Sequence, residues 1–139
     1  MVIIGIDHGK KRVGIAKSDE LGMFAHALCF FKAEPEEELF RKIANLIDET
    51  KAEICVVGLP LQMDGSEGIA AQGVMAFVER MKAVVTIPIE AYDERLTTAE
   101  AMEYLRASGM SGKKKRKKVD ALAAQIMLQG YIDEMKASN

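Results

Sequence analysis

The apolar and polar stretches at the start of the chain predict three consecutive strands. Residues 2–6 form a β-branched, nearly unbroken apolar run, which is typical of a strand buried on both faces. A Gly/Lys turn follows, and apolar residues then alternate with small ones over residues 12–18, as in the second strand of a hairpin. Gly22 marks another turn, after which residues 25–31 complete an antiparallel meander.

The pattern then becomes helical before it returns to a strand. Acidic residues around Pro35 signal the start of a helix, and apolar residues at helical spacing extend it to about Thr50. Residues 53–59 are again almost entirely apolar, which predicts a fourth strand. Because a helix separates this strand from the meander, we expect a parallel pairing with a right-handed connection.

A loop over residues 60–68 leads to a second helix and then to a fifth strand. The strand is expected over residues 84–92, where Pro88 suggests a sheet edge or a kink. The helix carries one apolar stripe, formed by Ala70, Val74, Phe77, Val78 and Met81.

Two further helices are expected in the last third of the chain. Thr97 and Glu100 match a capping box, which opens a helix that stops near Gly109. The last helix is predicted over about residues 117–136, and its inward positions are Leu122, Ala123, Ile126 and Met127. This order of elements predicts an α/β fold in a single domain, residues 1–139, with a mixed five-stranded sheet. Parallel strands extend the antiparallel meander, and helices cover both faces.

Composition narrows the class of protein. The chain has 139 residues, is 49% hydrophobic and 29% charged, and has a net charge of −2, as is typical of a soluble domain with its own core. Cys29 and Cys55 lie in apolar runs, which indicates reduced, buried thiols. No leader pattern and no apolar run of about 18 residues is present, so we expect a cytoplasmic protein that does not contact membranes.

Acidic residues follow separate predicted elements and could meet at one edge of the sheet. Asp7 ends the first strand, Asp93 and Glu94 end the fifth, and Asp120 lies in the first turn of the last helix. Open α/β sheets keep their sites at the carboxyl ends of strands. Clustered carboxylates repel one another unless a cation lies among them, and Mg²⁺ prefers oxygen ligands. Two such ions could hold a phosphodiester and activate a water, although each acid also fits a turn or a helix terminus.

Two basic clusters accompany these acids. Lys10, Lys11 and Arg12 follow Asp7 directly. An unbroken basic run precedes Asp120 and consists of Lys113, Lys114, Lys115, Arg116, Lys117 and Lys118. Most charge runs are solvated loops, but this position favours binding of phosphate backbones with a strong dependence on salt.

Four motifs resemble those of the YqgF/RuvX family, in the family's order and over nearly the whole chain. GIDHGKKRVGIA at residues 5–16 resembles the family's GxDxGxxRxGxA start. The other three are VGLP with a following Asp-Gly at residues 57–65, DERLTT at residues 93–98, and KKVDALAA with a following Leu-Gln at residues 117–129.

The resemblance implies an RNase H-like fold and a nuclease that uses Mg²⁺ or Mn²⁺. The family is described both as Holliday junction resolvases and as nucleases that mature the 5′ end of 16S ribosomal RNA precursors. Structured RNA and branched DNA are therefore both candidate partners, and a two-fold symmetric junction would suit a homodimer. Asp7 and Asp120 match the family's catalytic acids directly, whereas the middle acid is either Asp93 or Glu94. Arg95 either pairs with an acid or holds phosphate.

Strand alternation bears on the middle acid. Asp93 shares a face with Ile89 and Ala91, whereas Glu94 is on the opposite parity. A regular strand directs only one of the two acids at Asp7. We favour Glu94 as the metal ligand beside Asp7, because its longer side chain can reach round the strand end, with Asp93 in a supporting role.

Two other functions remain open at this stage. A non-catalytic nucleic-acid- or ribosome-binding factor would keep the basic clusters and leave the acids unused. Asp-x-Gly before a second strand also begins the sugar-kinase ATPase fold, but those enzymes need two such domains.

Overall fold

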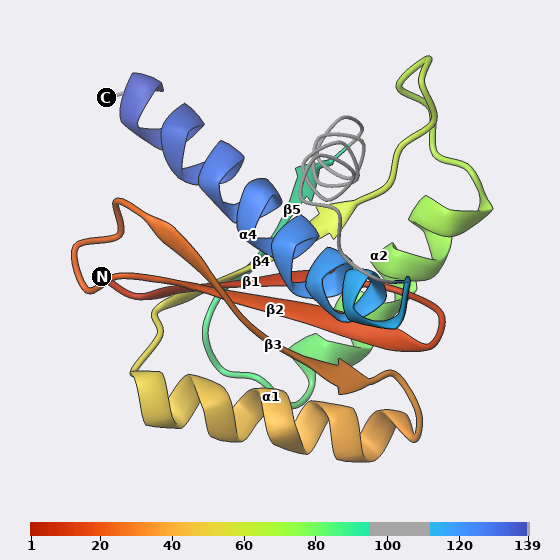
Figure 1. Cartoon of the computed structure of the whole chain (residues 1–139), viewed down its shortest axis with the longest axis horizontal. Helices are drawn as coiled ribbons and strands as arrows, with labels where there is room; N and C mark the ends of the chain where they lie inside the picture. Colours follow the sequence, from red (N-terminus) through yellow and green to blue (C-terminus); the bar gives the residue numbers. More distant parts are fainter. Residues whose placement is uncertain (95–111, 139) are drawn as a thin grey trace.

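The five predicted strands form one mixed sheet, as the computed structural model shows for residues 1–94 and 112–138 (Figure 1). Side chains are described for residues 1–94 and 121–138. The strands are β1 (Ile3–His8), β2 (Arg12–Ser18), β3 (Ala25–Lys32), β4 (Ile54–Leu59) and β5 (Ile89–Asp93). They lie in the order β3-β2-β1-β4-β5. β1 pairs antiparallel with β2 and parallel with β4, β2 pairs antiparallel with β3, and β4 pairs parallel with β5. The predicted α/β architecture is confirmed.

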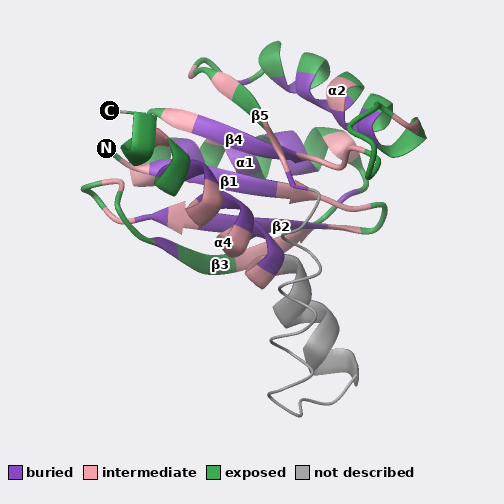
Figure 2. Ribbon diagram, turned by 90° about the horizontal axis from the view of Figure 1, so that it is seen from above, coloured by how far each residue is buried: buried purple, intermediate pink, exposed green. Residues whose placement is uncertain are grey.

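Helices cover both faces of this sheet, which divides the core into two parts. α1 (Glu36–Thr50) and α2 (Ile69–Lys82) pack on one face, and α4 (Gly112–Ser138) packs on the other (Figure 1). The central strands β1, β2 and β4 are mostly buried between the helical layers (Figure 2). In the described ranges, none of the helices is both long enough and apolar enough to cross a membrane.

Strand parity assigns each residue of β1 to one of these two cores. Ile4 and Ile6 belong to the core beneath α1 and α2, whereas Ile3 belongs to the core beneath α4. Because side chains alternate along a strand, Asp7 falls on the α4 side and His8 on the α2 side. The His8 ring accordingly lies against Phe77 of α2, with 4.3 Å between the ring centroids.

The elements around the last helix differ from the prediction in extent. α4 begins at Gly112, about five residues before the expected start at 117, so the run 113–118 belongs to the helix and not to a preceding loop. Lys and Arg are strong helix formers, which explains why the helix includes them. The helix expected between Thr97 and Gly109 lies outside the described residues.

The fifth strand is shorter than predicted, and Pro88 explains why. β5 begins at Ile89, whereas the N–H groups of Val84 and Val85 donate to the Met81 carbonyl at the end of α2. Proline lacks an N–H and is confined to strand ends and sheet edges. β5 is indeed an edge strand, and the Pro88 carbonyl accepts a hydrogen bond from the Cys55 N–H at 3.0 Å.

The predicted apolar stripe of α2 is confirmed except at Ala70, whereas that of α4 is shifted by about one residue. In α2, Ala71 is buried and Ala70 is exposed, while Val74 and Phe77 lie inward as expected. In α4, Leu122 and Ile126 are only partly buried. The buried residues of α4 are Ala123, Ala124, Met127, Leu128, Tyr131 and Ile132.

A close approach between β1 and α4 fixes the position of the helix. A Cβ added at Gly5 would lie 2.9 Å from Leu128 Cβ and 3.3 Å from Leu128 Cδ2. Real Cβ atoms essentially never approach another heavy atom closer than 3.0 Å, so a side chain at this position would push α4 away from the sheet.

We therefore expect Gly5→Ala to lower the free energy of unfolding by about 1–3 kcal/mol, as overpacking of a core does. Gly73→Ala is the matched control, because a Cβ there would meet nothing within 4 Å on α2. That control should leave stability unchanged or raise it by about 0.5–1 kcal/mol. Urea denaturation measures both, and equal effects at the two positions would contradict the packing described for α4.

Candidate active site

Asp7 and Glu94 meet at the carboxyl edge of the sheet. β1, β4 and β5 run parallel, so their carboxyl ends share one edge. Glu94 follows β5 directly, and its N–H donates to the Leu59 carbonyl at 3.2 Å. The two carboxyl groups are hydrogen-bonded to each other, and Glu94 is only 8% exposed. A buried glutamate that follows β5 is thus paired at this edge with a partly exposed aspartate of β1.

The environment of Glu94 favours its protonated form. Four effects raise the pKa of Glu94 to about 9. Burial is the largest of them, followed by the charge of Asp7, the hydrogen bond with Asp7 and the charge of Asp93. Two adjacent carboxyl groups cannot both ionise at low cost when one of them is buried, because the charge on the buried group is neither solvated nor neutralised. Without a cation, the pair therefore holds a proton near neutral pH.

Gly58 of β4 creates the space that Glu94 occupies. A Cβ at Gly58 would clash with Glu94 Oε2 and lie 2.7 Å from Glu94 Cδ and 3.4 Å from Met127 Cγ. The carboxyl group therefore lies over the bare backbone of β4, under α4. Sequence reasoning identified Gly58 only as part of a motif, although a glycine inside an apolar strand often marks a close approach.

Glu94 has the same strand parity as the residues of β5 that face α4. Two earlier residues of the same parity contact Tyr131 of α4, since the Tyr131 hydroxyl donates to Glu90 and the Tyr92 ring meets Tyr131 edge-on at 6.0 Å. Glu94 is the next residue of the same parity and contacts Asp7. Asp93, of the opposite parity, acts on Glu94 through its charge.

The N-terminal part of α4 lies nearer to Asp7 than its C-terminal part does. Gln129 accepts a hydrogen bond from the Ala25 N–H at 2.8 Å, so this part of the helix lies at the end of the sheet far from Asp7. Asp120 is eight residues before Leu128, the residue that contacts Gly5, and thus about 12 Å along the axis toward the carboxyl edge. The backbone of Asp120 therefore lies toward this edge, and its role as a third acid stays a prediction. Its side chain lies outside the described part of the chain.

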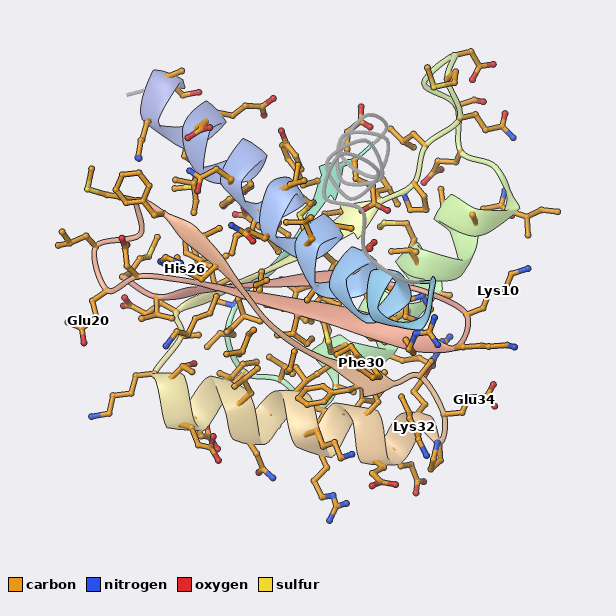
Figure 3. The ribbon with its side chains drawn as sticks, viewed as in Figure 1. Lys10, Glu20, His26, Phe30, Lys32 and Glu34 are labelled. Carbon is orange, nitrogen blue, oxygen red and sulfur yellow. The ribbon has the colours of Figure 1, made fainter. Side chains whose placement is uncertain are left out.

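The turn between β1 and β2 presents three cations at the same edge. Gly9 donates its N–H to the Arg12 carbonyl at 3.0 Å, and a Cβ at Gly9 would lie 2.6 Å from that oxygen, so the turn is tight. Lys10 and Lys11 are exposed, whereas the Arg12 guanidinium lies 6.0 Å from the centre of the Phe30 ring. Figure 3 shows Lys10 at this end of the molecule and His26 at the opposite end.

The remaining predicted site residues fall outside the described side chains. These are Arg95, Lys113, Lys114, Lys115, Arg116, Lys117 and Lys118. Among the side chains that are described, no three His, Cys, Asp or Glu residues are grouped closely enough to hold a metal ion.

His8 is excluded from direct contact with the Asp7–Glu94 pair by strand parity. Its ring lies on the α2 face, and burial lowers the pKa of His8, although the nearby charge of Glu36 acts in the opposite direction. Being next to Asp7 in sequence thus does not bring the imidazole to the carboxyl pair.

Comparison with known proteins identifies one family and a set of relatives. The family model described as "RuvX: Holliday junction resolvase" matches residues 1–134. A Syntrophus aciditrophicus protein named "Putative pre-16S rRNA nuclease" is 43% identical over 133 residues, which cover 96% of this chain and 89% of the relative. A Clostridium acetobutylicum protein of the same name is 37% identical over 135 residues, which cover 97% of this chain and 100% of the relative.

Solved structures share the fold at much lower identity. The chain resembles Thermus thermophilus RuvC in complex with a Holliday junction substrate, with a TM-score of 0.58 and 16% identity over 97% of this chain and 96% of that one. It also resembles the fowlpox virus resolvase in complex with Holliday junction DNA, with a TM-score of 0.56 and 12% identity over 97% of this chain and 99% of that one. These neighbours support the expected RNase H-like fold.

The Asp7–Glu94 pair predicts an unusual dependence of stability on pH. In the unfolded chain Glu94 releases its proton near its usual pKa of 4.5, whereas the folded chain keeps it up to about 9. The contribution of Glu94 to stability is therefore complete below the unfolded pKa and is lost as the pH rises toward the folded one.

We expect Glu94→Gln to raise the free energy of unfolding in EDTA at pH 8 by about 1–3 kcal/mol and to have little effect at pH 4.5. Urea denaturation of both proteins across this range isolates Glu94 from the other titrating groups. Parallel curves for wild type and variant would show that Glu94 is not a buried, proton-holding partner of Asp7.

Proposed function

Because the chain belongs to the RuvX family, whose description is Holliday junction resolvase, we propose that it is a divalent-metal-dependent endonuclease acting on structured nucleic acid. The observation that carries this proposal is the contact of the buried Glu94 carboxyl group with Asp7 at the carboxyl edge of the sheet. Such a pair is costly to bury unless it binds something positively charged.

The chemistry of the pair fits a hard divalent cation. Mg²⁺ and Mn²⁺ take carboxylate oxygens as ligands, and a cation would relieve the repulsion that raises the pKa of Glu94. We assign Asp7, Glu94 and Asp120 as the ligands, with Asp93 as a supporting acid. When bound, the ion would stabilise negative charge on the phosphodiester and lower the pKa of a water molecule.

The protein's own residues position the substrate around this edge. Lys10, Lys11 and Arg12 would hold backbone phosphates next to Asp7, and the predicted basic residues of α4, with Arg95, would extend this contact. Since the net charge of the chain is −2, binding depends on these local cations and should weaken steeply with salt. Gly58 and α4 keep Glu94 away from bulk water, so its carboxyl group stays directed at Asp7.

Two substrates fit the proposal, and they differ in the assembly they require. The names of the relatives point to the 5′ end of a 16S ribosomal RNA precursor, which one active site could cleave. The description of the family points to a Holliday junction, whose two-fold symmetry calls for two sites and hence a homodimer. We favour the ribosomal RNA precursor because relatives similar over nearly their whole length carry that name.

The decisive variant is Asp7→Asn, compared with wild type on a 16S precursor end and on a four-way DNA junction. With Mn²⁺ or Mg²⁺, we expect cleavage of at least one substrate by wild type and a loss of more than about 100-fold in the variant. Asp48→Asn on the exposed side of α1 is the matched control and should cleave like wild type.

EDTA should abolish the same activity. The proposal fails if Asp7→Asn cleaves at the wild-type rate. It also fails if wild type binds both nucleic acids with Mn²⁺ present and cuts neither, which would indicate a non-catalytic binding protein.

A further inference from the structure

A cavity of about 740 Å³ lies beneath the β1–β2 turn, on the face of the sheet opposite Asp7 and Glu94. Its polar lining comes from β1, the β1–β2 turn, the start of α1 and α2. These residues are His8, Lys10, Glu34, Glu36 and Arg80. Figure 3 shows Lys10 and Glu34 at the same end of the molecule. The cavity therefore shares the carboxyl end of β1 with the candidate active site.

The aromatic part of the cavity is held in place by α2. The His8 ring lies against Phe77, with 4.3 Å between the centroids and 34° between the planes. Phe77 is fully buried and packs in turn on Phe40, at 5.5 Å. One side of the imidazole is thus fixed, and its other surface contributes to the wall of the cavity.

An ion pair fixes the charged part. Arg80 Nε donates to Glu36 Oε1 at 2.5 Å, and Arg80 Nη2 donates to Glu36 Oε2 at 3.0 Å. This two-point contact joins α2 to the first turn of α1 and orients the guanidinium plane. Both side chains are partly exposed, so they remain accessible to a ligand.

The charges in the lining select against simple ions. Two cations, Lys10 and Arg80, face two carboxylates, Glu34 and Glu36. An inorganic anion would meet the carboxylates, and a metal cation would meet the lysine and arginine. A ligand that carries both an anionic group and hydrogen-bond donors can bind the two cations with its anionic group and the two carboxylates with its donors. The volume lies within the range of about 300–1,000 Å³ that is usual for small-molecule sites.

We propose that this cavity binds one nucleotide whose base carries an exocyclic amine. Its phosphate lies toward Lys10 and Arg80, and its amine donates to Glu34 or Glu36, since carboxylates accept from base amines and basic side chains bind phosphate. Because Lys10 lies in the turn that borders the candidate active site, we assign this nucleotide to the substrate strand, beside the bond that is cut. This last assignment rests on the proposed nuclease function.

The two histidines of the chain provide a direct test that needs no cleavage. Adenosine 5′-monophosphate is titrated into the full chain in EDTA, and the ring proton signals are followed by NMR. His8 lines the cavity and His26 lies at the other end of the molecule, so only the His8 signals should shift, with saturation (Figure 3). His26→Gln assigns the two signals.

Variants test which groups bind the nucleotide. Arg80→Gln should weaken binding by about tenfold, as expected for the loss of a charge-assisted contact. Arg41→Gln is the matched control, because Arg41 is another exposed arginine, on α1, and is not among the lining residues. Glu34→Gln should reduce the preference for adenosine over uridine monophosphate, since uracil has no exocyclic amine.

Several results would overturn the proposal. These are no shift of the His8 signals, equal binding of inorganic phosphate and the nucleotide, and equal losses in Arg80→Gln and Arg41→Gln. A four-way junction or precursor end with an adenosine-rich single-stranded extension should displace the mononucleotide in EDTA, and a uridine-rich extension should do so less well.

If the mononucleotide binds but neither extension displaces it, the cavity takes a free nucleotide and the assignment to the substrate strand is wrong. If the mononucleotide binds and the wild-type protein cleaves neither nucleic acid, the cavity is a nucleotide site and the proposed nuclease function is wrong.

Discussion

The contact between Asp7 and Glu94 is the constraint on which the rest of the structure depends. The fold brings two acids from different strands together under a helix, where burial raises the pKa of Glu94 to about 9. A stable core has no need for such a pair, since an apolar residue at either position would be cheaper to bury. The pair is explained if the site exists to bind a cation, and the tight turn after β1 then places cations for phosphate beside it.

Glycine makes this arrangement sterically feasible. Gly5 lets α4 approach β1, and Gly58 leaves room on β4 for the Glu94 carboxyl group. The same helix covers Glu94 and carries Asp120 toward the carboxyl edge, so packing and candidate chemistry share the same few contacts. On the opposite face, His8, which alternates with Asp7 along β1, lines a cavity together with residues of α1 and α2. The carboxyl end of β1 thus contributes one residue to the candidate active site on one face and one to the cavity on the other.

Much of this could be predicted from the sequence because strands and parity leave clear patterns. The bounds of β2 were expected as found. Alternation along β5 indicated that only one of Asp93 and Glu94 faces Asp7, and the longer side chain of Glu94 favoured that residue, which is the one in contact with Asp7. The start of α4 was missed because a run of lysines looks like a loop when only charge is considered. The role of Gly58 and the cavity around His8 could not be predicted, since both depend on contacts between elements distant in sequence.

The central claim, that Asp7 and Glu94 form a cation site, is tested most directly by anomalous diffraction from crystals of the protein soaked in Mn²⁺. The account predicts an anomalous peak bound to carboxylate oxygens of both Asp7 and Glu94, with the hydrogen bond between the two side chains broken. The same map would show whether Asp120 is the third ligand. A well-ordered site in which the two carboxyl groups remain bonded to each other, with manganese elsewhere or absent, would contradict it.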